Sequence, residues 1–403
     1  MKIMYLHQYF RIPELGGAIR SYEFSRRFVK NGHSVDMISG PTNVFDHYNK
    51  KNVNIDGIDV HFVGAGYSSK MSYKKRIVSF MIYAILATIK GMRLEKPDII
   101  YATSTPLTVC IPALILSKFY NVPFVFEVRD LWPEAPIQMG AIKNKFLIKI
   151  LRKLERKTYN DASHIIALSP GMAEGVYKQD VEKDKVTVIP NSSDIEYFNN
   201  VDANKEALKQ KYGIKSDNIF IYAGAINIAN GVDIILNAAH NLKKQNKDLH
   251  FILAGEGKML KELEELNEKY NLDNVTFTGR ISKSEVAKLY SISNAAFVIF
   301  EDIPILNTNS PNKFFDSLAA AKPVITNMDG WIKNLVEENN AGLYFANGNI
   351  EKLENCILKL CDDNLSKCMG ENSFNLAQIC FNRDKLASEA EKVLKEVLER
   401  NNY

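Results

Sequence analysis

Short apolar runs alternate with longer amphipathic stretches from one end of the chain to the other, and this alternation constrains the fold more than any other feature. Runs rich in Val, Ile and Phe indicate buried strands, and the stretches between them have the apolar spacing of helices. This pattern is typical of parallel sheets covered by helices. The sequence predicts strands at residues 2–6, 34–39, 59–63, 98–102, 123–127, 163–167, 186–189, 219–223, 249–254, 275–278, 295–300, 323–326 and 342–345.

A polar stretch from Pro190 to Asn204 divides the pattern into two halves and is the best linker candidate. A prior of roughly 150 residues per domain gives two or three domains for a chain of this length. We therefore predict two doubly wound, Rossmann-like α/β domains at 1–195 and 205–380, facing across a cleft. The last segment, 381–403, is expected to form a helix that packs back on the first domain.

Cysteine usage and the start of the chain indicate the compartment. The five cysteines are odd in number and include no Cys-x-x-Cys pair, which predicts a reduced, cytosolic setting without a disulfide framework or structural zinc. The first apolar run meets His7, Gln8 and Arg11 almost at once, which favours a buried strand over a secretory signal. The cysteines are Cys110, Cys356, Cys361, Cys368 and Cys380.

Basic residues are concentrated between Lys70 and Lys157, where 16 Lys or Arg stand against 6 Asp or Glu. The apolar run 77–89 in this region is shorter than the ~18 residues that a membrane-spanning helix needs. With the basic residues 74–76 before it and a basic helix after it, it predicts a surface that rests on anionic lipid. A buried helix beside a solvated basic helix remains the alternative. The basic residues of the later helix are Lys143, Lys145, Lys149, Arg152, Lys153, Arg156 and Lys157.

The segment 310–325 predicts a helix that carries an unusual lysine. Ser310 suits an N-cap, Pro311 the first helical position, and Pro323 ends the helix. Lys313 then occupies the third position, where Glu or Gln is usual because a helix N-terminus carries a partial positive charge. A bound anion would relieve this conflict, and a solvated surface lysine is the alternative. Asp316 follows one turn later on the same face.

Glycine-bearing loops follow several predicted strands. The first half has the pair Gly16-Gly17 after its first strand. The second half has loops around Gly224, Glu256 and Arg280 after three successive strands, and these loops could line one crevice at the carboxyl edge of the sheet. Each alone could be a structural turn. Because no Gly-x-Gly-x-x-Gly fingerprint is present, an NAD enzyme is not favoured.

Together these motifs resemble family 4 glycosyltransferases of the GT-B fold, and the resemblance covers nearly the whole chain. It is carried by Gly16-Gly17, Gly32-His33, Ile189-Pro190-Asn191 with Asp194, the loops at 224 and 255, and the run from Ser310 to Ile325. The segments 126–134, 154–156 and 167–172 are more narrowly similar to WbuB-type enzymes, a subgroup associated with L-fucosamine transfer in bacterial O-antigen and capsule assembly.

The resemblance implies a retaining, metal-independent transfer from a nucleotide-diphosphate sugar without a cofactor. The donor, expected to be UDP-linked with an N-acetyl deoxyhexosamine such as L-fucosamine, would bind mainly in the second domain. Lys313 would hold its diphosphate, Asp316 its ribose, and the backbone of Arg280 and Ile281 its base, with Glu256 beside the nucleotide. Gly17, with Gly16, would approach the reacting centre. The remaining donor-binding residues implied are Gly224, Asn227, Ser310 and Asn312.

The acceptor would bind mainly in the first domain, and the resemblance implies a saccharide or an undecaprenyl-diphosphate-linked saccharide at the inner face of the plasma membrane. Nucleic acid is not an expected partner. Asp130 is the expected polar residue facing the acceptor and belongs to the catalytic set with Lys313 and Gly17. An Arg129–Asp130 ion pair at a turn, and a structural role for His7, remain alternatives. The acceptor-binding residues expected are His7, Arg20, Glu127, Arg129 and Asp130.

The chain departs from the family pattern at the donor site. The Glu-x7-Glu element has Thr308 at its first position and Asp316 at its last, and two customary cations fall on Ala225 and Asn230. Lys313 would then carry more of the phosphate charge, helped by Asn227 or by Arg20. These departures leave two alternatives open, namely a nucleotide-sugar epimerase of related fold and a non-catalytic nucleotide-sugar binder.

Overall fold

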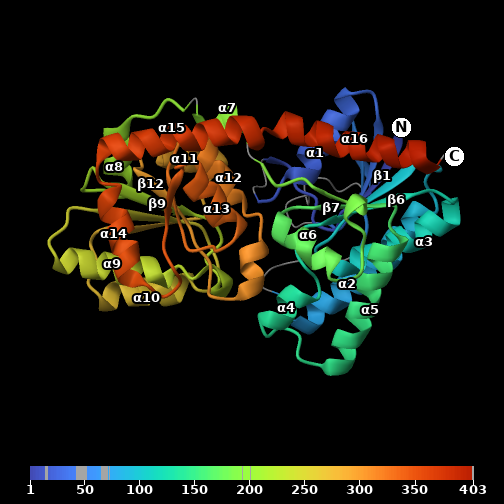
Figure 1. Cartoon of the computed structure of the whole chain (residues 1–403), viewed down its shortest axis with the longest axis horizontal. Coiled ribbons are helices and arrows are strands. Elements are labelled where there is room, and N and C mark those ends of the chain that lie inside the picture. The colour runs from blue at the N-terminus through green and yellow to red at the C-terminus, as the bar shows by residue number, and fades with distance from the viewer. Residues whose placement is uncertain are drawn as a thin grey trace. The chain divides into compact units, whose positions relative to one another are not determined.

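The computed structural model describes residues 1–13, 17–41, 52–64, 71, 73–192, 194–199 and 201–401. The chain forms two compact units (Figure 1). Unit 1 is Met1–Pro190 with Asp384–Tyr403, and unit 2 is Asn191–Arg383. The α/β fold class predicted from the alternating pattern is confirmed.

The sheet of unit 1 has eight strands in the order β3-β4-β2-β1-β5-β6-β7-β8. Every pair of neighbours is parallel except β3 and β4. The strands are β1 (Lys2–Leu6), β2 (Ser34–Ser39), β3 (Asn52–Ile55), β4 (Ile58–Phe62), β5 (Ile99–Thr103), β6 (Phe124–Val128), β7 (His164–Ala167) and β8 (Val186–Val188). The helices are α1 (Arg20–Lys30), α2 (Tyr73–Gly91), α3 (Cys110–Tyr120), α4 (Glu134–Gln138), α5 (Lys145–Asp161), α6 (Pro170–Tyr177) and α16 (Arg383–Asn401), with 3₁₀ turns at Leu107–Val109 and Lys183–Lys185.

Unit 2 has a six-stranded, wholly parallel sheet in the order β11-β10-β9-β12-β13-β14. Its strands are β9 (Ile219–Ala223), β10 (His250–Ala254), β11 (Val275–Gly279), β12 (Ala295–Val298), β13 (Val324–Thr326) and β14 (Gly342–Tyr344). Its helices are α7 (Ile195–Asn199), α8 (Lys205–Tyr212), α9 (Asp233–Lys244), α10 (Leu260–Lys269), α11 (Lys283–Ser291), α12 (Asn312–Ala319), α13 (Trp331–Glu338), α14 (Ile350–Lys359) and α15 (Asp363–Cys380), with 3₁₀ turns at Ile228–Asn230 and Pro304–Thr308.

Strand β3 is absent from the sequence prediction. It pairs with β4 through the two-residue turn Asp56-Gly57, in which φ is +50° and +84°. Positive φ at both residues is typical of the tight hairpin turn that Asp-Gly favours, so this dipeptide was a usable signal. The strand itself alternates exposed and half-buried residues, and such an edge strand lacks the continuous apolar run of its neighbours.

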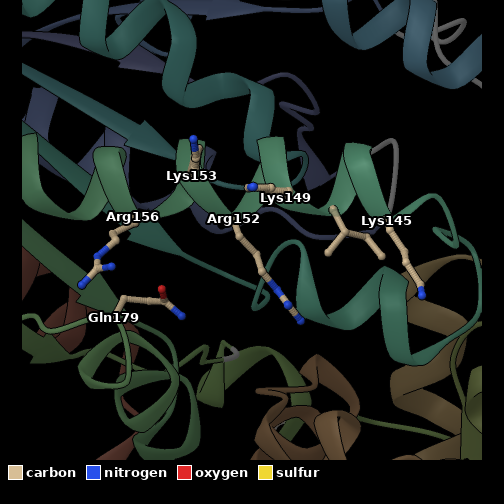
Figure 2. Close-up of a pocket in the computed structure, with 7 residues that line it drawn as sticks. Lys145, Lys149, Arg152, Lys153, Arg156 and Gln179 are labelled. Carbon is tan, nitrogen blue, oxygen red and sulfur yellow. The ribbon is translucent and has the colours of Figure 1, made fainter.

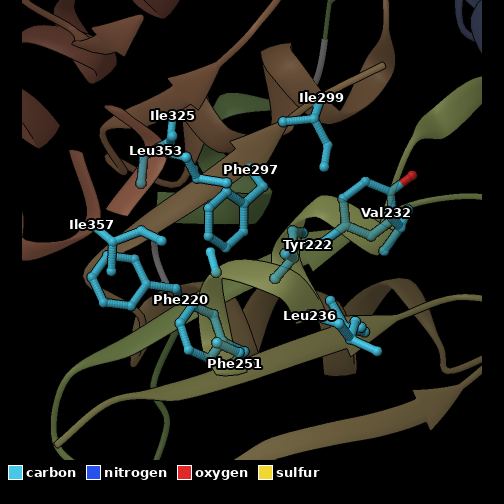
Figure 3. Packing of buried hydrophobic residues seen from close by; sticks show 14 of the residues in the cluster. Phe220, Tyr222, Val232, Leu236, Phe251, Phe297, Ile299, Ile325, Leu353 and Ile357 are labelled. Carbon is cyan, nitrogen blue, oxygen red and sulfur yellow. The ribbon is translucent and has the colours of Figure 1, made fainter. Parts of the chain in front are cut away.

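An aromatic layer forms part of the core of unit 2. Phe220, Phe251 and Phe297 come from β9, β10 and β12 and are at most 1% exposed. Their ring centroids lie 6.0 to 6.3 Å apart, as expected for aromatic side chains that pack in a core (Figure 3). This packing fixes the relative positions of β9, β10 and β12, and candidate donor loops follow the first two of these strands.

The C-terminal helix α16 belongs to the core of unit 1. Leu386 and Leu394 are buried in one cluster with Tyr5 of β1 and Phe24 of α1. At the rim, Glu391 accepts hydrogen bonds from the side chains of neighbouring polar residues, including His33 Nε2 at 2.9 Å. The helix therefore covers one face of the sheet together with α1, and α2, α3 and α5 lie on the other side (Figure 1).

Candidate active site

Each sheet has one place where the strand order reverses. In unit 1 this lies between β1 and β5, and in unit 2 between β9 and β12. Ligands of open α/β sheets bind in the crevice beyond the carboxyl ends of the strands at such a point. The residues that follow these four strands are therefore the first place to look for chemistry.

Lys313 lies at the reversal point of unit 2. Its Nζ donates to the carbonyl oxygen of Ile299, which follows β12, at 2.8 Å, and to the hydroxyl of Tyr222 on β9 at 3.3 Å. The ammonium also lies 4.1 Å from the ring centroid of Phe300 and 4.5 Å from that of Tyr222. A helical side chain from α12 thus bridges the ends of two strands that are adjacent in the sheet.

The surroundings of Lys313 contain hydrogen-bond acceptors and aromatic rings but no acidic group in salt-bridge contact among the described residues. The residue is only 7% exposed, so the alternative of a solvated surface lysine is wrong. Burial lowers the pKa of its ammonium well below the usual value. The charged form is therefore underpaired, and an anion in the crevice would stabilise it.

The start of α12 differs from the prediction. The helix begins at Asn312 with Pro311 as N-cap, so Lys313 is its second residue and not its third. Ser310 is not the cap because its Oγ accepts from the backbone N–H of Asn191 at 3.1 Å and its carbonyl accepts from Asn191 Nδ2 at 2.8 Å. Ser310 thus holds the start of unit 2, and its own polar atoms are engaged. The helix also ends at Ala319, before Pro323.

The loops after β9, β10 and β11 lie together at one edge of the sheet. Gly224 N donates to Ala254 O at 2.9 Å, Ile226 N to Glu256 O at 2.9 Å, and Gly255 N to Gly279 O at 3.0 Å. A Cβ at Gly255 would lie 1.8 Å from the carbonyl oxygen of Gly224, so this glycine is required by the close approach of two backbones. The three loops therefore lie together as predicted. The close approach of two loop backbones explains the glycine at position 255.

The other residues expected at the donor site lie around this edge. Asn227 Oδ1 accepts from the backbone N–H of Lys258 at 3.0 Å and so links two of the loops. Asp316, half-buried on α12, lies close enough to Tyr290 to raise the pKa of that phenol further, beyond the larger effect of burial. The other three residues lie in the loops after β10 and β11. Glu256 and Arg280 are exposed, and Ile281 packs on an apolar cluster.

In unit 1, His7 follows β1 at the reversal point and is 2% exposed. Its Nδ1 lies 2.7 Å from Ser21 Oγ, and Arg129 Nη1 donates to its Nε2 at 3.3 Å. Because a guanidinium can only donate, Nε2 is the acceptor and the proton is on Nδ1, which donates to Ser21. Burial, with Arg129 and Arg11 nearby, lowers the pKa of His7 well below its usual value, so the ring is neutral.

Asp130 lies beyond β6 and accepts a hydrogen bond from Thr105 Oγ1 at 3.0 Å. Burial raises the pKa of this carboxyl, and the Thr105 hydrogen bond and Arg129 partly oppose the rise. No ion pair joins Arg129 to Asp130 in the described part of the chain, so the turn-capping alternative is not supported. Asp130 is half-buried, and its expected contact with the acceptor stays a prediction.

Arg20 and Glu127, both expected at the acceptor, form a buried ion pair. Glu127 is fully buried and accepts from Arg20 Nε at 2.9 Å, Tyr101 OH at 2.6 Å and Thr103 Oγ1 at 2.7 Å. The two terminal nitrogens of Arg20 donate to the carbonyl oxygens of Pro190 and Ile189, at 2.6 and 3.0 Å. Both side chains are therefore engaged within unit 1, and the acceptor-binding roles of Arg20 and Glu127, with the help of Arg20 at the phosphate, stay predictions.

Gly17 has φ of +88°, a left-handed conformation that favours glycine. It is exposed, and a Cβ there would lie 3.2 Å from Arg11 Nη1. Gly16 lies outside the described residues. The approach of this glycine pair to a reacting sugar stays a prediction.

Two features of these strand ends were not predicted from the sequence. Gln8 is 2% exposed, and among the residues that the structure describes neither its amide nitrogen nor its amide oxygen has a hydrogen-bond partner. Such an orphaned amide beside His7 at a strand end is suited to a hydroxyl of a ligand. The second feature is the aromatic support of Lys313 by Tyr222 and Phe300. The position of Gln8 directly after a buried strand was a signal, whereas the aromatic contacts depend on the fold.

The comparisons with known proteins agree on one class. Residues 204–375 match the family model described as Glycosyl transferases group 1, and residues 16–192 match the Glycosyl transferase 4-like domain. An uncharacterized glycosyltransferase of Methanocaldococcus jannaschii is 25% identical over 80% of this chain and 82% of its own length. The alpha-monoglucosyldiacylglycerol synthase of Streptococcus pneumoniae is 27% identical over 62% of this chain and 56% of its own.

Solved structures show the same fold. A sucrose-phosphate synthase from Thermosynechococcus elongatus has a TM-score of 0.79 at 17% identity and covers 99% of both chains. HepE of Anabaena, in complex with UDP and glucose, has a TM-score of 0.74 at 17% identity and covers 98% of this chain and 100% of its own.

Two Rossmann-like units, each with one reversal point in its strand order, together with these relatives define a glycosyltransferase of the GT-B fold. Because the two family models together span most of the chain, the protein belongs to the group 1 glycosyltransferases of family 4, which transfer sugars from nucleotide-sugar donors. The resemblance inferred from the motifs is confirmed at the level of the family. The narrower WbuB-like subgroup stays a prediction.

Proposed function

We propose that this protein transfers a sugar, with retention of configuration and without a metal ion, from a nucleoside-diphosphate donor bound at the crevice of unit 2. The observation that carries the proposal is Lys313, a buried ammonium without an acidic partner in the described contacts. A donor diphosphate would supply the missing anion at the end of β9 and β12. Asp316 would accept the ribose hydroxyls, and the loop at Arg280 and Ile281 would bind the base.

The chemistry required of the protein is the stabilisation of charge on the leaving diphosphate. The bond between the anomeric carbon and the diphosphate oxygen breaks while the acceptor oxygen bonds to the same face, and the acceptor proton passes to the leaving phosphate. Lys313 would stabilise the negative charge that develops on that phosphate. Ala225 and Asn230 supply no cation, so more of this task falls on Lys313.

We further propose a UDP-linked donor, with an N-acetyl deoxyhexosamine such as L-fucosamine as the sugar. The acceptor would be a saccharide or an undecaprenyl-diphosphate-linked saccharide in bacterial surface polysaccharide assembly, used at the inner face of the plasma membrane. The complex of HepE with UDP supports the nucleotide, and the diacylglycerol-glycosylating relative supports a lipid-linked acceptor by analogy.

A thermal-shift screen with UDP, GDP, CMP and ADP tests the donor site. One of the diphosphates, expected to be UDP, should raise the melting temperature, because a ligand at ~100 times its dissociation constant stabilises the folded state by about 2.7 kcal/mol. CMP serves as the comparison without a second phosphate. No shift with any of the four would contradict a nucleotide-sugar site in unit 2.

The two alternatives differ in their products. An epimerase would form product from the donor alone, and a non-catalytic binder would give the thermal shift without turnover. Product that forms only when donor and acceptor are both present supports the transferase.

A further inference from the structure

Helix α2 presents an apolar face to solvent. Val78 is 57% exposed and Ile85 is 56% exposed, in a helix whose opposite side is buried on the sheet. Their spacing of seven residues places them on one face. These exposures show that the alternative of a wholly buried helix at residues 77–89 is wrong. The other exposed apolar side chains of this helix and its end are Ile77, Met81, Leu86, Ile89 and Met92.

Helices α3 and α5 extend this face. α2 packs on α3, and α3 packs on α5. Tyr120 OH at the end of α3 hydrogen-bonds to the carbonyl oxygen of Gly91, the last residue of α2, and to that of Leu94 beyond it. The exposed apolar residues here are Phe119 at 57% and Phe146 at 73%, with Ile115 and Ile150 beside them on their helices. Exposed large apolar side chains on three helices that pack on one another indicate an interaction surface in a folded protein.

Helices α2, α3 and α5 carry basic residues, and the segments that bear their exposed apolar side chains contain no acidic residue. Residues 71–94 and 104–121 contain no Asp or Glu, and neither do residues 143–154. Along α5, basic residues at intervals of three and four line a groove of about 470 Å³ that Gln179 closes on the other side (Figure 2). The basic lining residues are Lys145, Lys149, Arg152, Lys153 and Arg156.

Part of this charge is unpaired. Arg152 bonds to Glu134 at 3.1 Å, and Arg156 pairs with Asp180. In contrast, Lys145, Lys149 and Lys153 have no ion pair among the described residues. The groove therefore retains free cationic side chains that suit phosphate groups.

We propose that the outer face of α2, α3 and α5 docks on a bilayer that contains anionic phospholipid. The apolar side chains of the three helices would enter the interface, and the groove along α5 would bind lipid phosphates. No helix within the described segments has the length and apolarity to cross a bilayer, so the contact would be peripheral. A second copy of the chain fits less well, because two such faces would place basic charge against basic charge.

Flotation of the full chain with vesicles tests this proposal. Binding is expected with phosphatidylcholine vesicles that contain phosphatidylglycerol, and it should weaken at high salt. Each lysine near an anionic leaflet contributes about a five-fold gain in affinity, so the double variant Lys149→Glu, Lys153→Glu is expected to lose roughly 25-fold or more. The double variant Val78→Glu, Ile85→Glu should lose at least about tenfold, because it removes two inserting side chains.

Matched controls place the same changes elsewhere. Lys261→Glu with Lys392→Glu has the same charge change at side chains that are 86% and 76% exposed, and Ile379→Glu replaces an isoleucine that is 67% exposed. These should bind vesicles as the parent chain does. The urea denaturation of every variant is compared with that of the parent chain, because α2 and α5 belong to unit 1 and an unchanged transition shows that this unit is folded.

Three results would overturn the docking proposal. The first is equal vesicle binding by the parent chain and both double variants, and the second is equal losses in the matched controls. The third is a dimer in solution that the Val78→Glu, Ile85→Glu variant converts to a monomer without any effect on vesicles, because this would assign the face to a second copy of the chain.

Discussion

Replacement of Lys313 by alanine is expected to lower kcat by a factor on the order of 100 or more, the range seen when one charge stabiliser of a transition state is lost. The physical reason is that the Nζ lies at the end of β9 and β12 with no acidic partner in the described contacts, where it can neutralise the leaving diphosphate. The measurement is steady-state transfer with donor and acceptor, with folding checked by the melting temperature.

Lys322 provides a matched control for this prediction. It is also a largely buried lysine of unit 2, and burial lowers the pKa of its ammonium to about 8, but it donates to the carbonyl oxygen of Ser291 away from the crevice. Lys322→Ala should leave kcat near the parent value after any change in stability is taken into account. A Lys313→Ala protein with near-normal kcat would remove the role assigned to this side chain.

Replacement of Glu127 by glutamine is expected to lower the unfolding free energy of unit 1 by about 3–5 kcal/mol, because one partner of a buried ion pair is removed and Arg20 is left unpaired. The measurement is urea denaturation at neutral pH. The double variant Glu127→Gln, Arg20→Met should lose less than the sum of the two single variants, since no buried charge is left alone.

The same pair determines a pH dependence. Burial alone would raise the pKa of Glu127, but Arg20, Arg129 and the hydrogen bonds from Tyr101 and Thr103 outweigh it, so the pKa is lowered. A carboxyl with a lowered folded pKa stabilises the fold above its unfolded pKa and loses this contribution as the pH falls through the folded value. The Glu127→Gln protein should therefore lose less stability on acidification. A loss below about 1 kcal/mol at neutral pH, or strict additivity in the double variant, would contradict this account.

The strands were predictable because buried parallel strands have continuous apolar runs that turn residues interrupt. Strand β3 was missed since it is a polar edge strand, although Asp56-Gly57 marked its turn. The unusual position of Lys313 near a helix start was also visible in the sequence. Its aromatic support was not, because Tyr222 lies 91 residues away along the chain.

The partnership of Arg20 with Glu127 was not predictable from the sequence. Arg20 and Glu127 are polar residues at a helix start and a strand end, and in the sequence they resemble ligand-binding residues. Their partnership spans 107 residues and depends on the order of the strands, so no local pattern revealed it. The sequence likewise did not determine whether the apolar face of α2 is exposed, because the spacing of apolar residues does not show which neighbouring element covers a helix.

The central claim is that Lys313 binds the diphosphate of a nucleotide donor, and titration calorimetry with a nucleoside diphosphate and its monophosphate tests it most directly. Burial lowers the pKa of Lys313 in the free protein, and a bound diphosphate should raise it, because an anion stabilises the charged form of the side chain. We predict that the parent chain binds UDP at least about tenfold more tightly than UMP, the effect of one charge-assisted contact, and that Lys313→Ala loses most of this preference. An equal preference for UDP over UMP in the two proteins would contradict the account.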